Sequence, residues 1–491
     1  MSDAYRQLER TFARLGTIEE ALAILHWDMS AKMPEGGAEA RAEQLAVLKS
    51  MHHEMLTRPE LGDLLDEAGQ APLDDWRRAN LREMRREWAH ARAVPADLVE
   101  ALSRAVSACE TVWRTARRDS DFALVAPKLE TVLGLVRQVA AAKSAALGVS
   151  PYDALLDEYE PGGRSAEIDV LFARLEVFLP DFLGRVMDAQ GPAPTLPAGP
   201  FPAAAQRALA LRLMGMVGFD FRHGRLDEST HPFCGGTPDD VRMTTRWDEA
   251  DFSTGLMGVL HETGHALYEQ GLPKAWRRQP VGRARGMSLH ESQSLLVEMQ
   301  ASRSLEFLTF ATPLIAEAFG GGPWDAHALW RDSVRVAPGF IRVDADEVTY
   351  PAHVILRYRL EKALIEDRMQ IGDLPAAWNE GMRTLLGIVP PDDRRGCLQD
   401  IHWFDGAWGY FPTYTLGAMT AAQLFEAAGR ALPDLGEQVA RGAFGGLLGW
   451  LRTNIHEKAS LLSAQDLLTQ ATGRPLDAAV FEAHLKRRYL G

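Results

Sequence analysis

Two histidines and a glutamate stand close together in the otherwise apolar stretch LMGVLHETGHALYEQGLP, residues 256 to 273. His261 and His265 are four residues apart, so in a helix both rings lie on one face and can reach the same divalent ion. Glu262, beside the first histidine, can then serve as general base toward a water that this ion activates. The pattern predicts metal-dependent hydrolysis.

The residues around this motif predict the helix that must carry it. Asp251 or Ser253 can cap its start, and Gly271 followed by Pro273 ends it. Gly264, between the two histidines, is a poor helix former that costs about 1 kcal/mol relative to alanine. This glycine is explained if another backbone or a substrate passes close by, and it can equally be incidental.

A catalytic zinc site needs a third protein ligand and leaves its fourth position for water. The following segment, GMSLHESQSLLVEMQASRS, offers Glu291 as that ligand. Glu298 lies on a similar helix face, and His290 is a further donor. Ser288 and Glu291 also fit a capping box, in which the carboxylate only satisfies a backbone N–H. Spacing alone leaves these alternatives open.

Long amphipathic helices are predicted to position the motif. Leucine, alanine and charged residues recur with helical spacing in stretches such as RAEQLAVLKSMHHEML and EIDVLFARLEVFLPDFLGRVM. Alternation typical of strands is scarce, although residues 233 to 246, FCGGTPDDVRMTTR, can form short strands. The sequence therefore predicts a mainly α-helical protein with minor β-strands.

One composition break divides the chain. Residues 190–206, QGPAPTLPAGPFPAAAQ, contain five prolines and two glycines and cannot form a continuous helix. We interpret residues 1–491 as a single domain, with an N-terminal helical half (1–189), this connection (190–206) and a half (207–491) that carries the predicted metal site.

Charge and cysteine content exclude several classes of protein. The formal charge of −14 and the pI near 5.5 argue against nucleic-acid binding, which needs a basic surface. The sequence has no run of eighteen apolar residues typical of a membrane span and no apolar secretory segment near its start. Cys109, Cys234 and Cys397 are few and widely spaced, which favours a reducing cytoplasm over a disulfide framework.

Five motifs, in this order, resemble those of the M32 metallocarboxypeptidases, the thermostable carboxypeptidase Taq type. They are DVRMT (240–244), HETGH (261–265), HESQS (290–294), IRVDAD (341–346) and GCLQDIHW (396–403). The stretches LHWDMSAKMPEGG (25–37) and YDALLDEYEPG (152–162) are also similar, so the resemblance spans nearly the whole chain.

The resemblance implies a large helical fold with a long, deep substrate groove, related to the neurolysin-like peptidases, and commonly a homodimer. It also implies one zinc or sometimes cobalt ion per chain, held by His261, His265 and Glu291, with Glu262 as general base and acid. The expected activity is release of C-terminal amino acids, with broad specificity, from peptides that have a free C-terminus.

A carboxypeptidase needs a cation that captures the terminal carboxylate of its substrate, and the planar fork of arginine suits this task. Arg342 is the first candidate and Arg242 the second. The alternative for Arg342 is an ion pair with Asp344 or Asp346, and for Arg242 an ion pair with Asp240.

Further polar residues can assist the reaction. His402, Tyr410 and Tyr414 are candidate donors to the oxyanion of the tetrahedral intermediate, and the proline between the two tyrosines favours a loop. Gln399 and Asp400 are expected to orient a ligand imidazole. The alternative for these residues is packing around the site.

Two other functions compete with the carboxypeptidase. An endo-acting oligopeptidase would use the same metal centre, and a non-catalytic, metal-bound helical scaffold would bind peptides without cleaving them. An aminopeptidase is disfavoured because no amine-binding motif is recognised.

Overall fold

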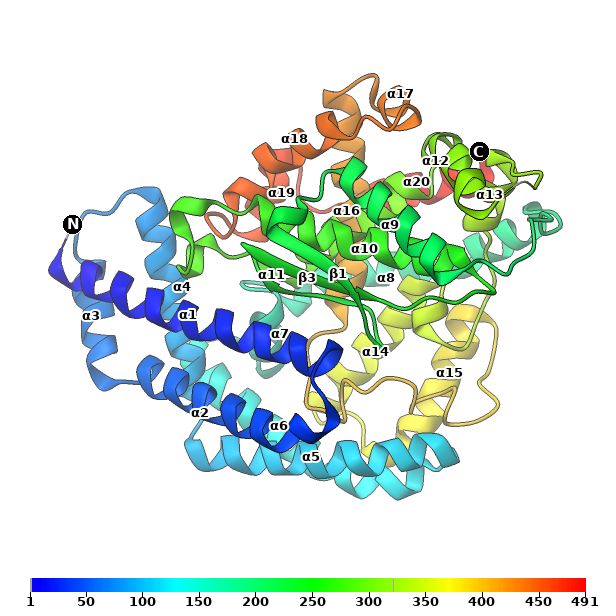
Figure 1. Ribbon diagram of the computed structural model, residues 1–491. Helices are drawn as coiled ribbons and strands as arrows, with labels where there is room; N and C mark the ends of the chain where they lie inside the picture. The colour runs from blue at the N-terminus through cyan, green and yellow to red at the C-terminus, as the bar shows by residue number, and fades with distance from the viewer. Residues whose placement is uncertain (1, 321) are drawn as a thin grey trace.

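Helices make up most of the chain and surround one small sheet (Figure 1), which confirms the predicted mainly α fold. The structure, a computed structural model, describes residues 2–320 and 322–491. The helices before the connection are α1 (Asp3–Ala31), α2 (Ala38–Leu56), α3 (Pro59–Gly69), α4 (Asp75–Ala93), α5 (Ala96–Asp119), α6 (Phe122–Leu147), α7 (Pro151–Tyr159) and α8 (Ser165–Ala189).

The helices after the connection include those that carry the metal-site candidates. These are α9 (Ala203–Val217), α10 (Phe252–Gly271), α11 (Gly286–Leu295) and the π-helical segment η5 (Leu296–Ser302). The remaining helices are α12 (Leu305–Phe319), α13 (Ala326–Ser333), α14 (Tyr350–Ile365), α15 (Leu374–Leu386), α16 (Pro412–Ala431), α17 (Leu435–Ala440), α18 (Gly445–Asn454), α19 (Ala464–Thr472) and α20 (Ala478–Leu490).

Three short strands form the sheet in the order β1-β3-β2. They are β1 (Gly224–Glu228), β2 (Phe233–Thr237) and β3 (Asp240–Thr245), with β1 parallel and β2 antiparallel to β3. Strands β2 and β3 fall within the predicted range, whereas β1 was not predicted because GRLDE has a single large apolar residue. Val241 and Met243 of β3 are buried in one core with α10, so this face of the sheet covers the helix that carries His261 and His265.

The proline-rich connection is not helical, as predicted, since α8 ends at Ala189 and α9 begins at Ala203. It nevertheless does not separate two cores. The largest core joins α5 to α8 with α14, α15, α16 and α20, and a second core joins α9 to α12 with α16 to α19. A smaller third core holds α1 to α4 together. Both larger cores lie across this boundary or include α16, so the described helices of the two halves pack together. The division into two sequential halves stays a prediction.

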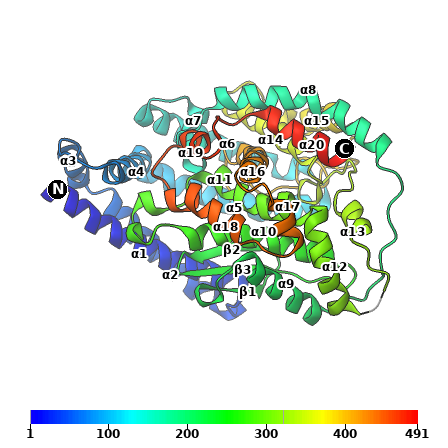
Figure 2. The ribbon, with the colours of Figure 1, turned by 90° about the horizontal axis from the view of Figure 1, so that it is seen from above.

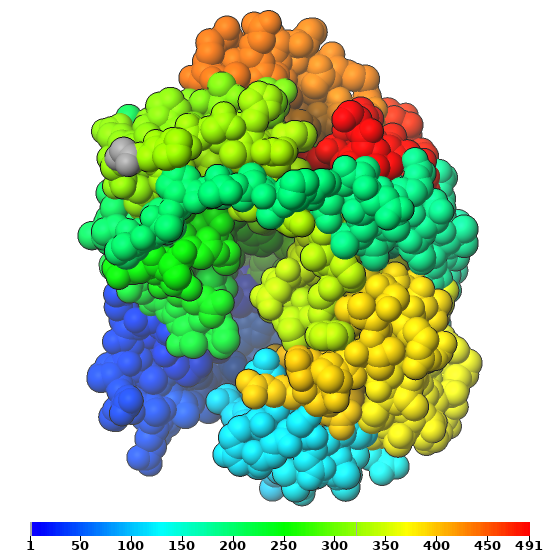
Figure 3. Space-filling view, turned by 90° about the vertical axis from the view of Figure 1, so that its right-hand side faces the viewer, coloured from blue at the N-terminus to red at the C-terminus, as the bar shows by residue number. Residues whose placement is uncertain are grey.

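A hollow opens below this connection in the space-filling view (Figure 3), between the segments coloured blue and green and those coloured yellow. From above, α10, α11 and α16 occupy the middle of the molecule, while α1 and α2 run along one side (Figure 2). Within the described residues no single helix is long and apolar enough to cross a membrane; α6 and α7 reach that length and composition only together, bent by 86°.

Candidate active site

Helix α10 begins and ends where the sequence predicts. The side chain of Asp251 accepts hydrogen bonds from the backbone N–H groups of Ser253 and Thr254, so Asp251 is the cap. The helix ends at Gly271. His261 and His265 therefore share one face, and their ring centroids lie 5.1 Å apart.

Two glycines allow three helices to meet at this point. A Cβ added at Gly264 would lie 2.2 Å from the carbonyl oxygen of Gln293 and 2.6 Å from the Cα of Ser294, so the backbone of α11 crosses directly over α10. A Cβ at Gly417 of α16 would lie 2.7 Å from the Cβ of Glu291. Gly264 is thus explained by a close backbone approach, and α16 holds Glu291 against the histidines.

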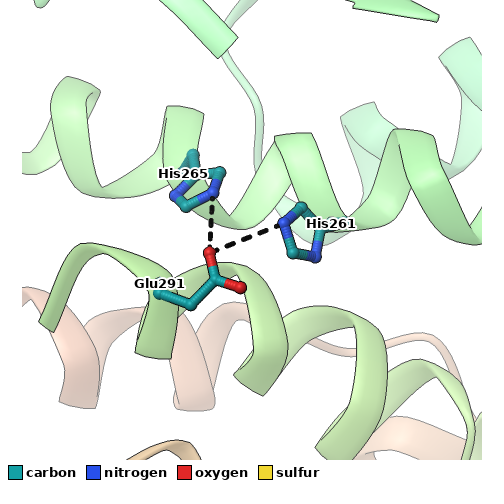
Figure 4. A group of neighbouring side chains, drawn as sticks. All are labelled: His261, His265 and Glu291. Carbon is teal, nitrogen blue, oxygen red and sulfur yellow. Dashed lines mark ion pairs between the residues drawn. The ribbon is translucent and has the colours of Figure 1, made fainter. Parts of the chain in front are cut away.

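The crossing brings His261, His265 and Glu291 together (Figure 4). The Glu291 Oε2 atom lies 3.4 Å from the Nε2 atom of His265 and 3.8 Å from that of His261. One ligand atom from each side chain fits within 4.8 Å of the others. The alternative of a capping box is wrong, because α11 begins at Gly286 and Ser288 lies inside it.

The second ring nitrogen of His261 has a carboxylate partner. Its Nδ1 atom lies 2.9 Å from the Glu298 Oε2 atom, and Arg303 holds the other oxygen of Glu298 at 2.8 Å. Glu298 lies in η5, where the π-helical turn shifts the side chain relative to Glu291. Glu298 therefore lies on the Nδ1 side of His261, where it can orient the ring, and is not part of the His261/His265/Glu291 cluster.

His265 is backed by an imidazole instead. The His290 Nδ1 atom lies 2.6 Å from the His265 Nδ1 atom, and the His290 Nε2 atom lies 2.8 Å from the Glu269 Oε1 atom. If His265 presents Nε2 to an ion, its Nδ1–H donates to His290, whose Nε2–H donates to Glu269. His290 thus fixes the orientation of the His265 ring. Glu269 and His290 also line a cavity of about 470 Å³ between α10, α11 and α1.

The charges of the cluster strongly perturb its pKa values. Burial lowers the pKa of His261, but Glu291, Glu298 and Glu262 more than offset this and raise it to about 10. Burial lowers the pKa of His265 to about 4. Burial raises the pKa of Glu291, yet His261 and His265 bring it down to about 2. The carboxylate is ionised at neutral pH, as a metal ligand must be.

Glu262 lies on α10 next to the first histidine and is buried. Burial raises its pKa to about 7, with Glu291 adding to the rise and His261 opposing it. A carboxyl group with a pKa near the working pH can both accept and return a proton. This environment suits a general base.

Arg342 is buried beside Tyr350 and two residues of the GCLQDIHW motif. Its Nε and Nη2 atoms lie 3.1 and 2.8 Å from the Asp400 Oδ1 atom, its Nη1 atom lies 3.0 Å from the Tyr350 hydroxyl, and its backbone N–H donates to Gln399. The predicted alternative partners are wrong, since Asp346 accepts from backbone N–H groups and Asp344 is exposed. Of the five N–H donors of this guanidinium, one on each terminal nitrogen is left available.

The two tyrosines and His402 pack together, and Tyr414 lies beside this arginine. The Tyr410 and Tyr414 rings are 5.1 Å apart, the guanidinium of Arg342 lies 4.8 Å from the Tyr414 ring centroid, and the Tyr414 hydroxyl is 3.4 Å from the His402 Nε2 atom. Burial raises the pKa of both tyrosines, and Glu291 contributes, so both hydroxyls are protonated donors. Pro412 opens α16, so Tyr414 is helical and only Tyr410 lies in the predicted loop.

Two sequence-based assignments differ from the structure. Arg242 pairs with Asp240 at 2.7 and 3.0 Å and stacks over Trp27 of α1 at 4.5 Å, on the sheet face opposite to that of Val241. Its ion-pair alternative is therefore what the structure contains. Gln399 and Asp400 do not orient an imidazole ligand, because Arg342 holds both of them.

Four residues of the site were missed. Glu269 follows His265 by one helical turn, and this spacing could have indicated it. Arg357 of α14 pairs with Asp400 at 2.5 Å, and its position, like those of Arg303 and Tyr350, depends on contacts that no local pattern predicts.

Residues 7–489 match the family model of the carboxypeptidase Taq (M32) metallopeptidases. The chain belongs to this family. It is 40% identical over 482 residues to thermostable carboxypeptidase 1 of Thermus thermophilus, covering 95% of this chain and 94% of that protein. It is 35% identical over 488 residues to carboxypeptidase 1 of Bacillus subtilis, covering 97% and 96%.

Solved structures agree with this assignment. Metallocarboxypeptidase 1 of Trypanosoma cruzi superimposes with a TM-score of 0.98 at 40% identity, and the match covers 99% of both chains. The M32 carboxypeptidase of Deinococcus radiodurans gives a TM-score of 0.94 at 34% identity and also covers 99% of both chains. This M32 protein is a metallocarboxypeptidase, a hydrolase of peptides, and its family implies a divalent ion, for which the His/His/Glu cluster is a possible site.

Proposed function

We propose that His261, His265 and Glu291 hold one divalent ion, that Glu262 is the general base, and that Arg342 captures the terminal carboxylate of the peptide. The observation that supports this most is the convergence of three ligand atoms from α10 and α11 within 4.8 Å, next to a buried carboxyl with a raised pKa.

The donor set fits zinc, with cobalt as the second choice. Two imidazoles and one carboxylate are typical of catalytic zinc, and both imidazoles already have partners at Nδ1 that leave Nε2 for the ion. A bound ion would lower the pKa of a water molecule and polarise the scissile carbonyl.

Side chains of the protein would then transfer the protons of the reaction. Glu262 accepts a proton as water attacks the carbonyl carbon, and it delivers this proton to the nitrogen of the leaving amino acid. Tyr410, Tyr414 and His402 are close enough to one another to present a donor to the oxyanion.

The position of Arg342 supports exopeptidase action. Its two free N–H donors can bind one carboxylate, and Tyr350 and Tyr414 lie near both Arg342 and Glu291. In this scheme the terminal carboxylate binds Arg342, and the last peptide bond is the one presented to the metal ligands. Broad specificity fits this scheme, because the recognised group is the backbone terminus.

Hydrolysis of one N-blocked peptide, with a free and with an amidated C-terminus, tests the proposal. Zinc-loaded wild type should release the last residue from the free acid only, and Glu262→Gln should cleave neither peptide while still binding zinc. Equal cleavage of both forms would instead identify an endo-acting oligopeptidase. The predictions of a homodimer and of a cytoplasmic location stay predictions, which gel filtration with light scattering and cell fractionation can check.

A further inference from the structure

The charges behind Arg342 do not balance. Arg342 and Arg357 share a single carboxylate, with the Arg342 Nη2 atom 2.8 Å from the Asp400 Oδ1 atom and the Arg357 Nε atom 2.5 Å from the Oδ2 atom. The exposed fractions of these side chains are 6% for Arg342, 0% for Arg357 and 11% for Asp400. Two guanidinium groups and one carboxylate leave one surplus positive charge in a largely buried place.

The two guanidinium groups and the carboxylate between them stay charged at neutral pH. Burial lowers the pKa of Arg357 only to about 10. Burial raises the pKa of Asp400, but Arg342 and Arg357 hold it well below its usual range. The surplus charge is therefore present under the conditions in which a peptidase works.

Neighbouring side chains do not supply the missing negative charge. Burial lowers the pKa of His353 to about 3 and that of His402 to about 4, and it raises the pKa of Tyr350, so these groups are neutral at pH 7. In the described structure the next acidic residue along α14, Glu361, accepts hydrogen bonds from Tyr152 and Trp403 instead.

Arg357 itself cannot touch a substrate. Its Nη1 atom donates to the carbonyl of His353 at 2.8 Å, its Nη2 atom donates to Gln399 at 2.7 Å, and its guanidinium stacks over Trp378 at 4.4 Å. Each of the two arginines uses three of its five N–H donors, but the Arg357 side chain is fully buried, whereas that of Arg342 keeps an exposed fraction of 6%. The contact to an anion and the charge that attracts it therefore come from different residues.

We propose that Arg357 is a positioning residue that keeps the carboxylate subsite positive: it offsets the charge of Asp400, so that Arg342 stays available to a ligand with one negative charge. A buried uncompensated charge is costly, and a terminal carboxylate removes this cost on binding. The inference rests on the proposed role of Arg342 and adds the source of its anion selectivity.

Substitutions that change the charge in opposite directions test the proposal, with the zinc-loaded full-length enzyme and the free-acid peptide as substrate. Arg357→Gln makes the cluster neutral and should raise KM roughly ten- to a hundredfold, with a smaller effect on kcat. Asp400→Asn makes the cluster doubly positive, keeps an acceptor oxygen for Arg342, and should lower KM. A purely structural role would raise KM in both variants, because both loosen the same network.

Two more variants serve as controls. Arg357→Lys retains the charge and should keep KM near the wild-type value, and the double variant Arg357→Gln with Asp400→Asn restores one surplus charge and should recover most of the loss. If Arg357→Gln does not fold, the KM of Asp400→Asn and the KM of the double variant test whether the charge of Arg357 matters.

The two proposals fail in different ways. A rise of KM in Asp400→Asn, or an unchanged KM in Arg357→Gln, would overturn the role of Arg357 while wild type still rejects the amidated peptide. Cleavage of the amidated peptide by wild type at the rate of the free acid would overturn the role of Arg342 instead.

Discussion

Replacing Gly264 by alanine sets helix propensity against packing. Alanine in the interior of α10 should by itself stabilise the helix by about 1 kcal/mol. The added Cβ, however, would lie 2.2 Å from the carbonyl oxygen of Gln293 and 2.6 Å from the Cα of Ser294, where ordinary contacts begin near 3.4 Å. These atoms belong to the backbone, so no side-chain rotation relieves the overlap and α11 must move by about 1 Å.

The displacement has a cost in stability and a larger cost in metal binding. Overpacking of this kind destabilises by about 1–3 kcal/mol, which exceeds the gain in helix propensity. Glu291 lies two residues before Gln293 on the same helix and moves with it. Since metal–ligand distances tolerate only about 0.2 Å, a shift of about 1 Å should weaken zinc binding at least tenfold.

Gly258→Ala is the matched control, because Gly258 lies on the same helix and an added Cβ there would meet no atom within 4 Å. Melting temperatures of the zinc-free proteins and zinc affinities by competition with a chelating dye measure both effects. Gly258→Ala should raise the melting temperature and leave zinc affinity unchanged, whereas Gly264→Ala should lower both quantities. A Gly264→Ala protein as stable as the control, with wild-type zinc affinity, would refute the crossing argument.

Three further outcomes are expected. Glu298→Ala removes the partner of His261 and should weaken zinc binding about 10- to 100-fold by dye competition, whereas Glu317→Ala, which removes an exposed ion pair with Arg212, should not change it. Burial raises the pKa of Glu262 to about 7, so the ionised base is lost as pH falls through that value. The value of kcat/KM should therefore begin to decline at a pH well above 4.5, the usual pKa of a glutamate. A kcat/KM that stays constant down to pH 5 would contradict this role. Removing the ion with a chelator should abolish hydrolysis and lower the melting temperature. Zinc at about 100 times its Kd should restore about 2.7 kcal/mol of stability. Equal melting temperatures with and without zinc would contradict a zinc site that exists only in the folded protein.

The local parts of the site follow from the sequence. Helical periodicity and the cap at Asp251 fix α10, and the four-residue spacing of His261 and His265 then places both rings on one face in any tertiary context. The proline-rich connection and the two predicted strands are likewise local, because they depend on backbone preferences of neighbouring residues.

The choice among more distant partners needed the tertiary structure. Glu291 and Glu298 are equivalent by spacing, and only the crossing of α10 and α11, with the π-helical turn between the two glutamates, sends one to the Nε2 side and the other to Nδ1 of His261. Arg342 has acidic neighbours in sequence, yet it binds Asp400, 58 residues away. Local hydrogen bonding sets which face of a helix a side chain occupies, but the packing of several helices around shared cores decides what that face meets.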